Sequence, residues 1–227
     1  MNRNPGRTGH RIWRWLLALA LLPWCVGATW ALVPVLRASE AAAGFWVAFL
    51  GGAACWVAIF LLLPKPLWLY VIGHELTHVI WTWLFGGRVK SFRASSRGGQ
   101  VVVTRTNTLI VLAPYFFPLY AVLWSAGWGL AVWLLDGRDL TPWFHFGLGL
   151  TYAFHVTLSG YILRLRQPDI EAEGWVVSVP VIWLGNVWIL LVTLPLLTGR
   201  VTVGTALGWM LERTGRFLGW LGSGLGP

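Results

Sequence analysis

Long apolar stretches separated by short polar links dominate the pattern of this chain. Six of them approach or exceed the roughly 17–25 residues that a helix needs to cross a bilayer. They cover residues 12–36, 44–63, 67–85, 109–135, 143–163 and 175–197. Backbone polar groups must be paired internally in lipid, and no stretch alternates for long enough to indicate a barrel. The pattern predicts an all-α membrane protein with about six transmembrane helices, forming a single polytopic domain over residues 1–227.

A polar segment over residues 86–107 interrupts this helical pattern. Within it, the β-branched run Gln100-Val101-Val102-Val103-Thr104 follows the turn signal Ser96-Arg97-Gly98-Gly99, and a second short strand-like run over residues 88–94 precedes that turn. We therefore expect a short β-hairpin at the membrane surface.

The C-terminal stretch shows a third pattern. Its apolar residues are Leu207, Met210, Leu211, Phe217, Leu218 and Leu221, at helical spacing opposite Glu212, Arg213 and Arg216. This pattern is typical of an amphipathic helix that lies in the membrane interface, and a solvated tail is the alternative.

Composition and charge agree with a membrane protein. The chain is 57% hydrophobic and 11% charged, whereas soluble domains have roughly 45–50% apolar and about 25% charged residues. Its net charge of +9 is explained by anionic lipid headgroups, because the basic residues lie almost wholly between the apolar stretches. We therefore expect the lipid bilayer and no nucleic acid as a partner. We expect a multi-pass protein located in the cytoplasmic membrane of a prokaryote. The first stretch exceeds the roughly 7–15-residue core of a signal peptide, which is the alternative there.

The third apolar stretch carries the run His74-Glu75-Leu76-Thr77-His78. Histidines four residues apart lie on one helical face, so both imidazoles can bind one zinc ion, and Glu75 is placed to take a proton from a metal-bound water. Placing a charged side chain in mid-membrane costs about 2.5–3.5 kcal/mol of free energy. Binding a zinc ion would offset this cost for the ionisable residues of the motif. The motif predicts a zinc site with His74 and His78 as ligands and Glu75 as general base. Ordinary core residues are the alternative.

This motif and three weaker features resemble the site-2 protease family of intramembrane zinc metalloproteases. The weaker features are Gly86-Gly87-Arg88-Val89 at the start of the polar segment, Leu112-Ala113-Pro114-Tyr115-Phe116-Phe117-Pro118 at the start of a span, and Gln167-Pro168-Asp169 ahead of another. The resemblance covers about residues 66–197 and implies regulated cleavage of a substrate's transmembrane segment. The chain departs from the family in having no clear Asn-Pro plus Leu-Asp-Gly pairing, since Leu135-Asp136-Gly137 resembles a helix-ending turn. The resemblance therefore implies a divergent, minimal member.

The third protein ligand is left open between two residues, because catalytic zinc usually has three protein ligands and a water. Asp169 has the ligand type that the resemblance implies, a carboxylate beside a proline ahead of a helix, although salt bridges to Arg164 and Arg166 would also explain it. His155 lies near the middle of the fifth stretch, at a depth comparable with His74 and His78. We favour Asp169 and keep His155 as the alternative third ligand, with the other residue orienting a ligand or the substrate.

Together these features predict an intramembrane zinc metalloprotease that hydrolyses peptide bonds within or next to the membrane-spanning segments of a membrane-protein or peptide substrate. Glu75 would act as general base on water bound to one zinc ion. The strand over residues 100–104 would hold unwound substrate by main-chain pairing, with a purely structural hairpin as the alternative. A different class of function is a non-catalytic metal-binding or chaperone-like membrane protein that retains the protease fold. The sequence leaves the oligomeric state open.

Overall fold

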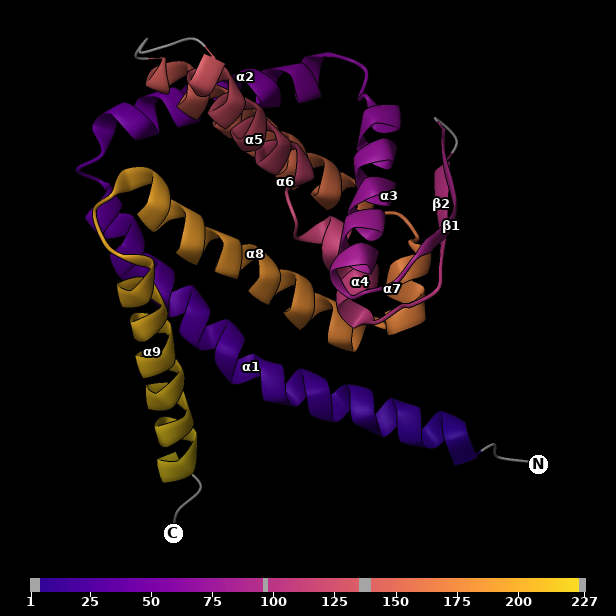
Figure 1. Cartoon of the computed structure of the whole chain (residues 1–227). Helices are drawn as coiled ribbons and strands as arrows, with labels where there is room; N and C mark the ends of the chain where they lie inside the picture. Colours follow the sequence, from indigo (N-terminus) through magenta and orange to yellow (C-terminus); the bar gives the residue numbers. More distant parts are fainter. Residues whose placement is uncertain (1–4, 96–97, 135–139, 225–227) are drawn as a thin grey trace. The chain divides into compact units, whose positions relative to one another are not determined.

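The computed structural model describes residues 5–95, 98–134 and 140–224, and it is built mostly of helices (Figure 1). The chain forms two compact units: a central unit of residues 42–169 and a terminal unit of residues 1–41 and 170–227. The central unit holds α2 (Ala43–Leu62), α3 (Leu67–Leu84), β1 (Val89–Ser95), β2 (Gly98–Val103), α4 (Thr108–Leu112), η1 (Ala113–Tyr115), α5 (Leu119–Leu134) and α6 (Thr141–Ile162). The chain passes from one unit to the other within α7 (Pro168–Glu173).

Helices α2 and α6 pack with their backbones in close contact. A side chain at Gly52 would overlap the carbonyl oxygen of Phe146, and one at Gly149 would overlap the carbonyl oxygen of Phe49. Small residues at a crossing allow membrane helices to approach in this way. The buried cluster beside the crossing joins α2, α3 and α6 and consists of Trp56, Tyr70, Ala153, Phe154 and Leu158.

Helix α3 carries the His-Glu-x-x-His run and is bounded by residues that cannot continue it. Pro66 precedes its first residue, and Gly86 follows its end with a φ of 70°, a conformation that glycine adopts without strain. The amide of Gly87 donates to the carbonyl of Thr82 at 2.8 Å, which closes the last turn. This reversal directs the chain back along α3, so both strands of the hairpin contact that helix (Figure 1).

The predicted hairpin is confirmed, with β1 and β2 antiparallel and the register Phe92↔Val101. Residues 96–97, part of the predicted turn, lie outside the described part of the chain. Strand β2 ends at Val103, one residue earlier than predicted. Thr104 instead closes the base of the hairpin, because its amide donates to the carbonyl of Arg88 at 2.9 Å and its hydroxyl accepts from the amide of Arg88 at 2.8 Å.

The expected continuous span over residues 109–135 is wrong in detail. Helices α4 and η1 (residues 108–115) form one limb and α5 forms the other, with a bend of 77° between them. Pro114 and Pro118 lie at the break, and prolines lack the amide hydrogen that a continuous helix needs. Asn107 caps the first limb, with its side-chain oxygen accepting from the amide of Ile110 at 2.8 Å. The bend brings the first limb to α3, with which both α4 and η1 are in contact.

The terminal unit consists of α1 (Pro5–Ser39), α8 (Trp175–Thr198), α9 (Val203–Gly224) and most of α7, and α1 packs against both α8 and α9. The indole nitrogen of Trp183 donates to the hydroxyl of Thr29 at 2.9 Å and joins α8 to α1. Gly27 gives Thr214 of α9 room against α1. The helix predicted near the C-terminus is therefore present as α9, and its position in a membrane interface stays a prediction.

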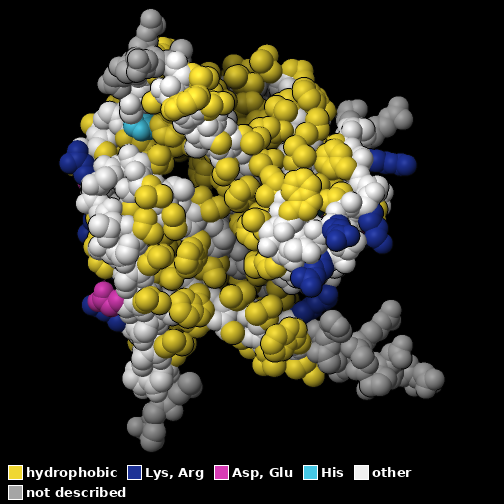
Figure 2. Space-filling view, in the orientation of Figure 1, with side chains coloured by type: hydrophobic (Ala, Val, Ile, Leu, Met, Phe, Trp, Pro, Cys, Tyr) yellow, Lys and Arg dark blue, Asp and Glu magenta, His cyan; other side chains and the backbone are white. Residues whose placement is uncertain are grey.

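Helix length and composition support a membrane protein, but fewer than the six predicted helices meet both criteria for a membrane span. Three described helices are long and apolar enough to cross a bilayer, over Ile12–Ser39, Ala43–Leu62 and Trp175–Thr198, and the bent pair gives a fourth if it counts as one span. The stretches predicted at 67–85 and 143–163 form α3 and α6, which carry more polar side chains. Hydrophobic side chains make up much of the surface visible in Figure 2.

Candidate metal centre

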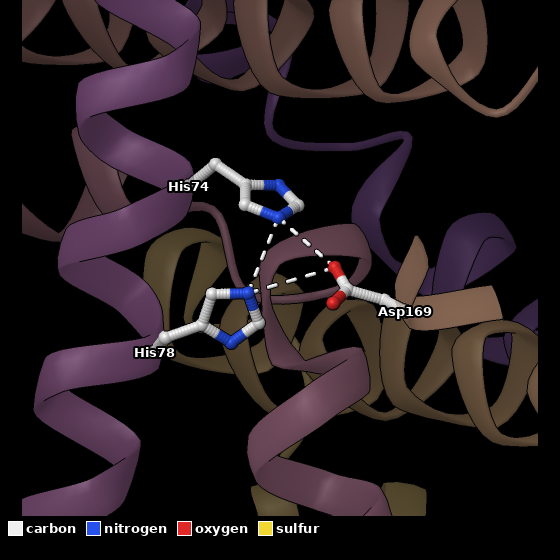
Figure 3. A group of neighbouring side chains, drawn as sticks. All are labelled: His74, His78 and Asp169. Carbon is white, nitrogen blue, oxygen red and sulfur yellow. Dashed lines mark hydrogen bonds and ion pairs between the residues drawn. The ribbon is translucent and has the colours of Figure 1, made fainter. Parts of the chain in front are cut away.

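The two histidines of α3 point their Nε2 atoms at the same place (Figure 3). These Nε2 atoms are 3.2 Å apart, as expected for residues one helical turn from each other. The Nδ1 atom of His78 lies 2.8 Å from the carbonyl oxygen of Ile110, which is in α4. This hydrogen bond requires the proton of His78 on Nδ1 and leaves Nε2 free to bind a metal. The bend before α5 thus has a role in the site, since it brings α4 to His78.

Asp169 completes the group from a distant part of the sequence. Its Oδ2 atom lies 3.1 Å from Nε2 of His74 and 3.5 Å from Nε2 of His78 (Figure 3). Asp169 is the second residue of α7, and the side chain of Gln167 donates to the carbonyl of Ile162 at 3.1 Å, which ties the segment to the end of α6. The hydroxyl of Tyr115 donates to the same Oδ2 atom at 3.0 Å.

The charge state of Asp169 suits a ligand. Burial favours the neutral acid, but hydrogen bonds and charge from His74 and His78 outweigh burial and hold the pKa of the Asp169 carboxyl below its usual range. Asp169 therefore remains an anion at neutral pH, which is the form that binds a metal ion.

The donor set fits zinc in chemistry and in spacing. Two imidazole nitrogens and one carboxylate oxygen form a ligand set found at catalytic zinc, and one atom from each residue lies within 4.8 Å of the others. Bonds of about 2.0–2.2 Å in a tetrahedron place ligand atoms roughly 3.3–3.6 Å apart. The three separations observed here are 3.1, 3.2 and 3.5 Å. Within the described residues, this is the one group of His, Cys, Asp and Glu side chains with such a geometry.

Glu75 lies between the two histidines in the sequence and is nearly buried, with 8% of its surface exposed. It is covered by the hairpin: a Cβ on Gly99 of β2 would overlap the carboxyl group of Glu75. A side chain at this position would require the Glu75 carboxyl group or the hairpin to move. The hairpin backbone therefore lies directly against the carboxylate of the expected general base, a contact that no sequence pattern predicts.

The other predicted candidates lie around this group or away from it. His155 is buried in α6 and is not part of the three-residue group. The run from Gln100 to Val103 forms most of β2, which packs on α3. The turn at residues 135–137 lies outside the described part of the chain.

The sequence does not predict that Ile110 and Tyr115 hold candidate metal ligands in place. The carbonyl of Ile110 carries no sequence signal, because every residue has one. In the sequence, Tyr115 stands out only as part of the run from Leu112 to Pro118, whereas the structure shows its hydroxyl donating to Asp169. Its place in the Pro114-Tyr115 turn was the one available signal.

Comparison with known proteins gives one match. The family model described as Peptidase M50B-like matches residues 52–132, a segment that includes α3, the hairpin and the bent pair and ends before Asp169. No curated protein and no solved structure matches the chain significantly. The match contains the His-Glu-x-x-His helix and supports a relationship between this chain and the site-2 protease family.

Proposed function

We propose that this chain is an intramembrane zinc metalloprotease that hydrolyses peptide bonds within or next to the membrane-spanning segments of its substrates. The observation that carries the proposal is the convergence of His74, His78 and Asp169, with Glu75 on the same helix as the two histidines. The family match supports it, because peptidases of this family are in general zinc metalloproteases.

His74, His78 and Asp169 would hold the zinc ion. When bound, zinc lowers the pKa of a water molecule and polarises the carbonyl of the scissile bond. Glu75 takes the proton of the attacking water and returns it to the leaving amine, so one carboxylate serves as base and then as acid. Tyr115 holds the Asp169 carboxylate by its hydrogen bond, and Ile110 holds the His78 ring by another.

The hairpin offers a way to present substrate to Glu75. A helical substrate hides its peptide bonds in internal hydrogen bonds, whereas an extended segment can pair with the edge of a strand. Strand β2 pairs with β1 along one edge, and its other edge has no strand partner in the described part of the chain. Because Gly99 of β2 touches Glu75, a segment paired along residues 100–103 would lie beside the catalytic carboxylate.

A non-catalytic metal-binding or chaperone-like protein that kept the fold is less favoured. Such a site requires His74, His78 and Asp169 but has no use for a carboxylate next to the metal that is not a ligand. Glu75 is that carboxylate, and burying it against the hairpin costs free energy that a simple binding site would avoid.

Glu75→Gln in the purified protein tests the proposal. The amide keeps the size of the side chain but cannot accept the proton, so zinc content should be unchanged while cleavage of a transmembrane peptide falls by about 10²–10⁴-fold. Glu212→Gln in α9 is the matched control and should cleave at the wild-type rate. Wild-type cleavage by Glu75→Gln would show that this residue is not the general base.

A further inference from the structure

The two histidine ligands differ in how their second ring nitrogen is held. A histidine that binds a metal almost always donates its other ring N–H to a carboxylate, a carbonyl or a water. For His78 that partner is the carbonyl of Ile110, at 2.8 Å. The Nδ1 atom of His74 is buried and has no hydrogen-bond partner among the described residues. A buried N–H without a partner costs about 1–3 kcal/mol, so His74 requires one.

A small cavity lies beside His74. It has a volume of about 20 Å³ and is lined by residues of α3, the bend before α5, and α6, including His74, Tyr120 and His155. A water molecule needs at least about 10–15 Å³ and two to four polar partners. A cavity of this volume has room for a water molecule.

His155 supplies a second polar group at this cavity. Its side chain is buried, and its Nε2 atom is, like Nδ1 of His74, without a hydrogen-bond partner in the part of the chain that the structure describes. Tyr120 also lines the cavity, and its hydroxyl donates its own proton to the carbonyl of Leu69 at 2.5 Å, which leaves its oxygen able to accept. His74 and His155 thus line one water-sized cavity, and each has a buried nitrogen without a partner among the described residues.

We propose that His155 is a positioning residue that binds a buried water molecule in this cavity, and that this water accepts the Nδ1 proton of His74. The water donates one hydrogen to Nε2 of His155. The inference rests on the proposed function, because it assigns His155 to the support of the same metal centre. His155 then does for His74 what the carbonyl of Ile110 does for His78: it fixes the tautomer and the orientation of the ring.

The test measures zinc affinity in the purified full-length protein, by competition with a chelator. Loss of an outer partner of a metal-bound histidine typically weakens affinity by about 10–100-fold, which is the effect expected for His155→Leu. His155→Gln retains an acceptor and should bind within about threefold of wild type, a smaller effect than loss of the partner. Phe154→Leu alters an apolar wall of the same cavity and is the control, with wild-type affinity expected.

Melting temperatures of all variants separate metal affinity from folding. Wild-type zinc affinity in His155→Leu would overturn the proposal, and so would equal weakening in Gln and Leu variants of equal melting temperature. A high-resolution density map of the wild-type protein gives a readout without any variant: a water within hydrogen-bonding distance of both nitrogens is expected, and its absence would also overturn the proposal. Wild-type protein that binds no zinc would instead refute the proposed metal centre itself.

Discussion

Replacing Asp169 by Ala should leave the purified protein largely free of zinc. In the structure its Oδ2 atom is in contact with both histidine nitrogens and accepts the hydrogen bond of Tyr115. The substitution removes the negatively charged donor and leaves two neutral imidazoles, which is one ligand fewer than catalytic zinc usually has.

The expected magnitude follows from comparison with a smaller change. Tyr115→Phe removes only the hydrogen bond that orients the carboxylate, and such losses cost about 10–100-fold in affinity, or roughly 1.4–2.8 kcal/mol. Removing the ligand itself must cost more, so Asp169→Ala should weaken zinc binding by more than about 100-fold. Asp169→Asn keeps one oxygen but no charge, so its loss of zinc affinity should lie between those of Tyr115→Phe and Asp169→Ala.

The assay is the zinc content of protein purified in detergent, followed by titration with a chelator of known affinity. Glu171→Ala is the matched control, because it removes an exposed carboxylate from the same helix without touching the histidines. Wild-type zinc affinity in Asp169→Ala, together with metal-free His155→Ala protein, would assign the third ligand to His155 and refute the geometric argument.

Three further changes test the surroundings of the site. Val102→Pro removes a main-chain donor from β2, so it should raise KM or block cleavage at normal zinc content. Val102→Ala is the control and should leave KM and cleavage unchanged. Unchanged kinetics in the proline variant would exclude substrate pairing with this strand. Gly99→Val should displace the hairpin from Glu75 and reduce kcat with zinc still bound, and full activity would show that their contact is dispensable. Gly149→Val should destabilise the protein by about 1–3 kcal/mol or more, because it forces α2 and α6 apart. The control is Gly160→Ala, where a side chain meets open space, and the melting temperatures of the two variants are compared.

Local features of the structure were accessible from the sequence. The ends of α3 follow from Pro66 and from Gly86, and the hairpin follows from β-branched residues around a glycine-containing turn. Two of the candidate metal ligands, His74 and His78, could be read directly, because a helix fixes the separation of residues four apart. Each of these inferences depends on neighbours in the chain, where the physical rules are strong.

Features that depend on distant residues could not be derived in the same way. The bend at Pro118 brings the carbonyl of Ile110 to His78, but no local pattern says which way the chain turns after a proline. Depth along a span favoured His155 as the third ligand, since one-dimensional depth ignores the direction in which a side chain points. The contact of Gly99 with Glu75 depends on how the whole hairpin lies on α3.

The proposed metal centre thus combines one ligand pair set by a helix with one ligand set by the fold. His74 and Asp169 are separated by 95 residues, yet protein contacts hold the carboxylate in place: Tyr115 donates to it, and Gln167 ties its segment to the end of α6. A third ligand anchored in this way loses little conformational freedom on binding, so little of the metal's binding free energy is spent on ordering it. His74, His78 and Asp169 all belong to the central unit, which therefore contains every zinc ligand proposed here.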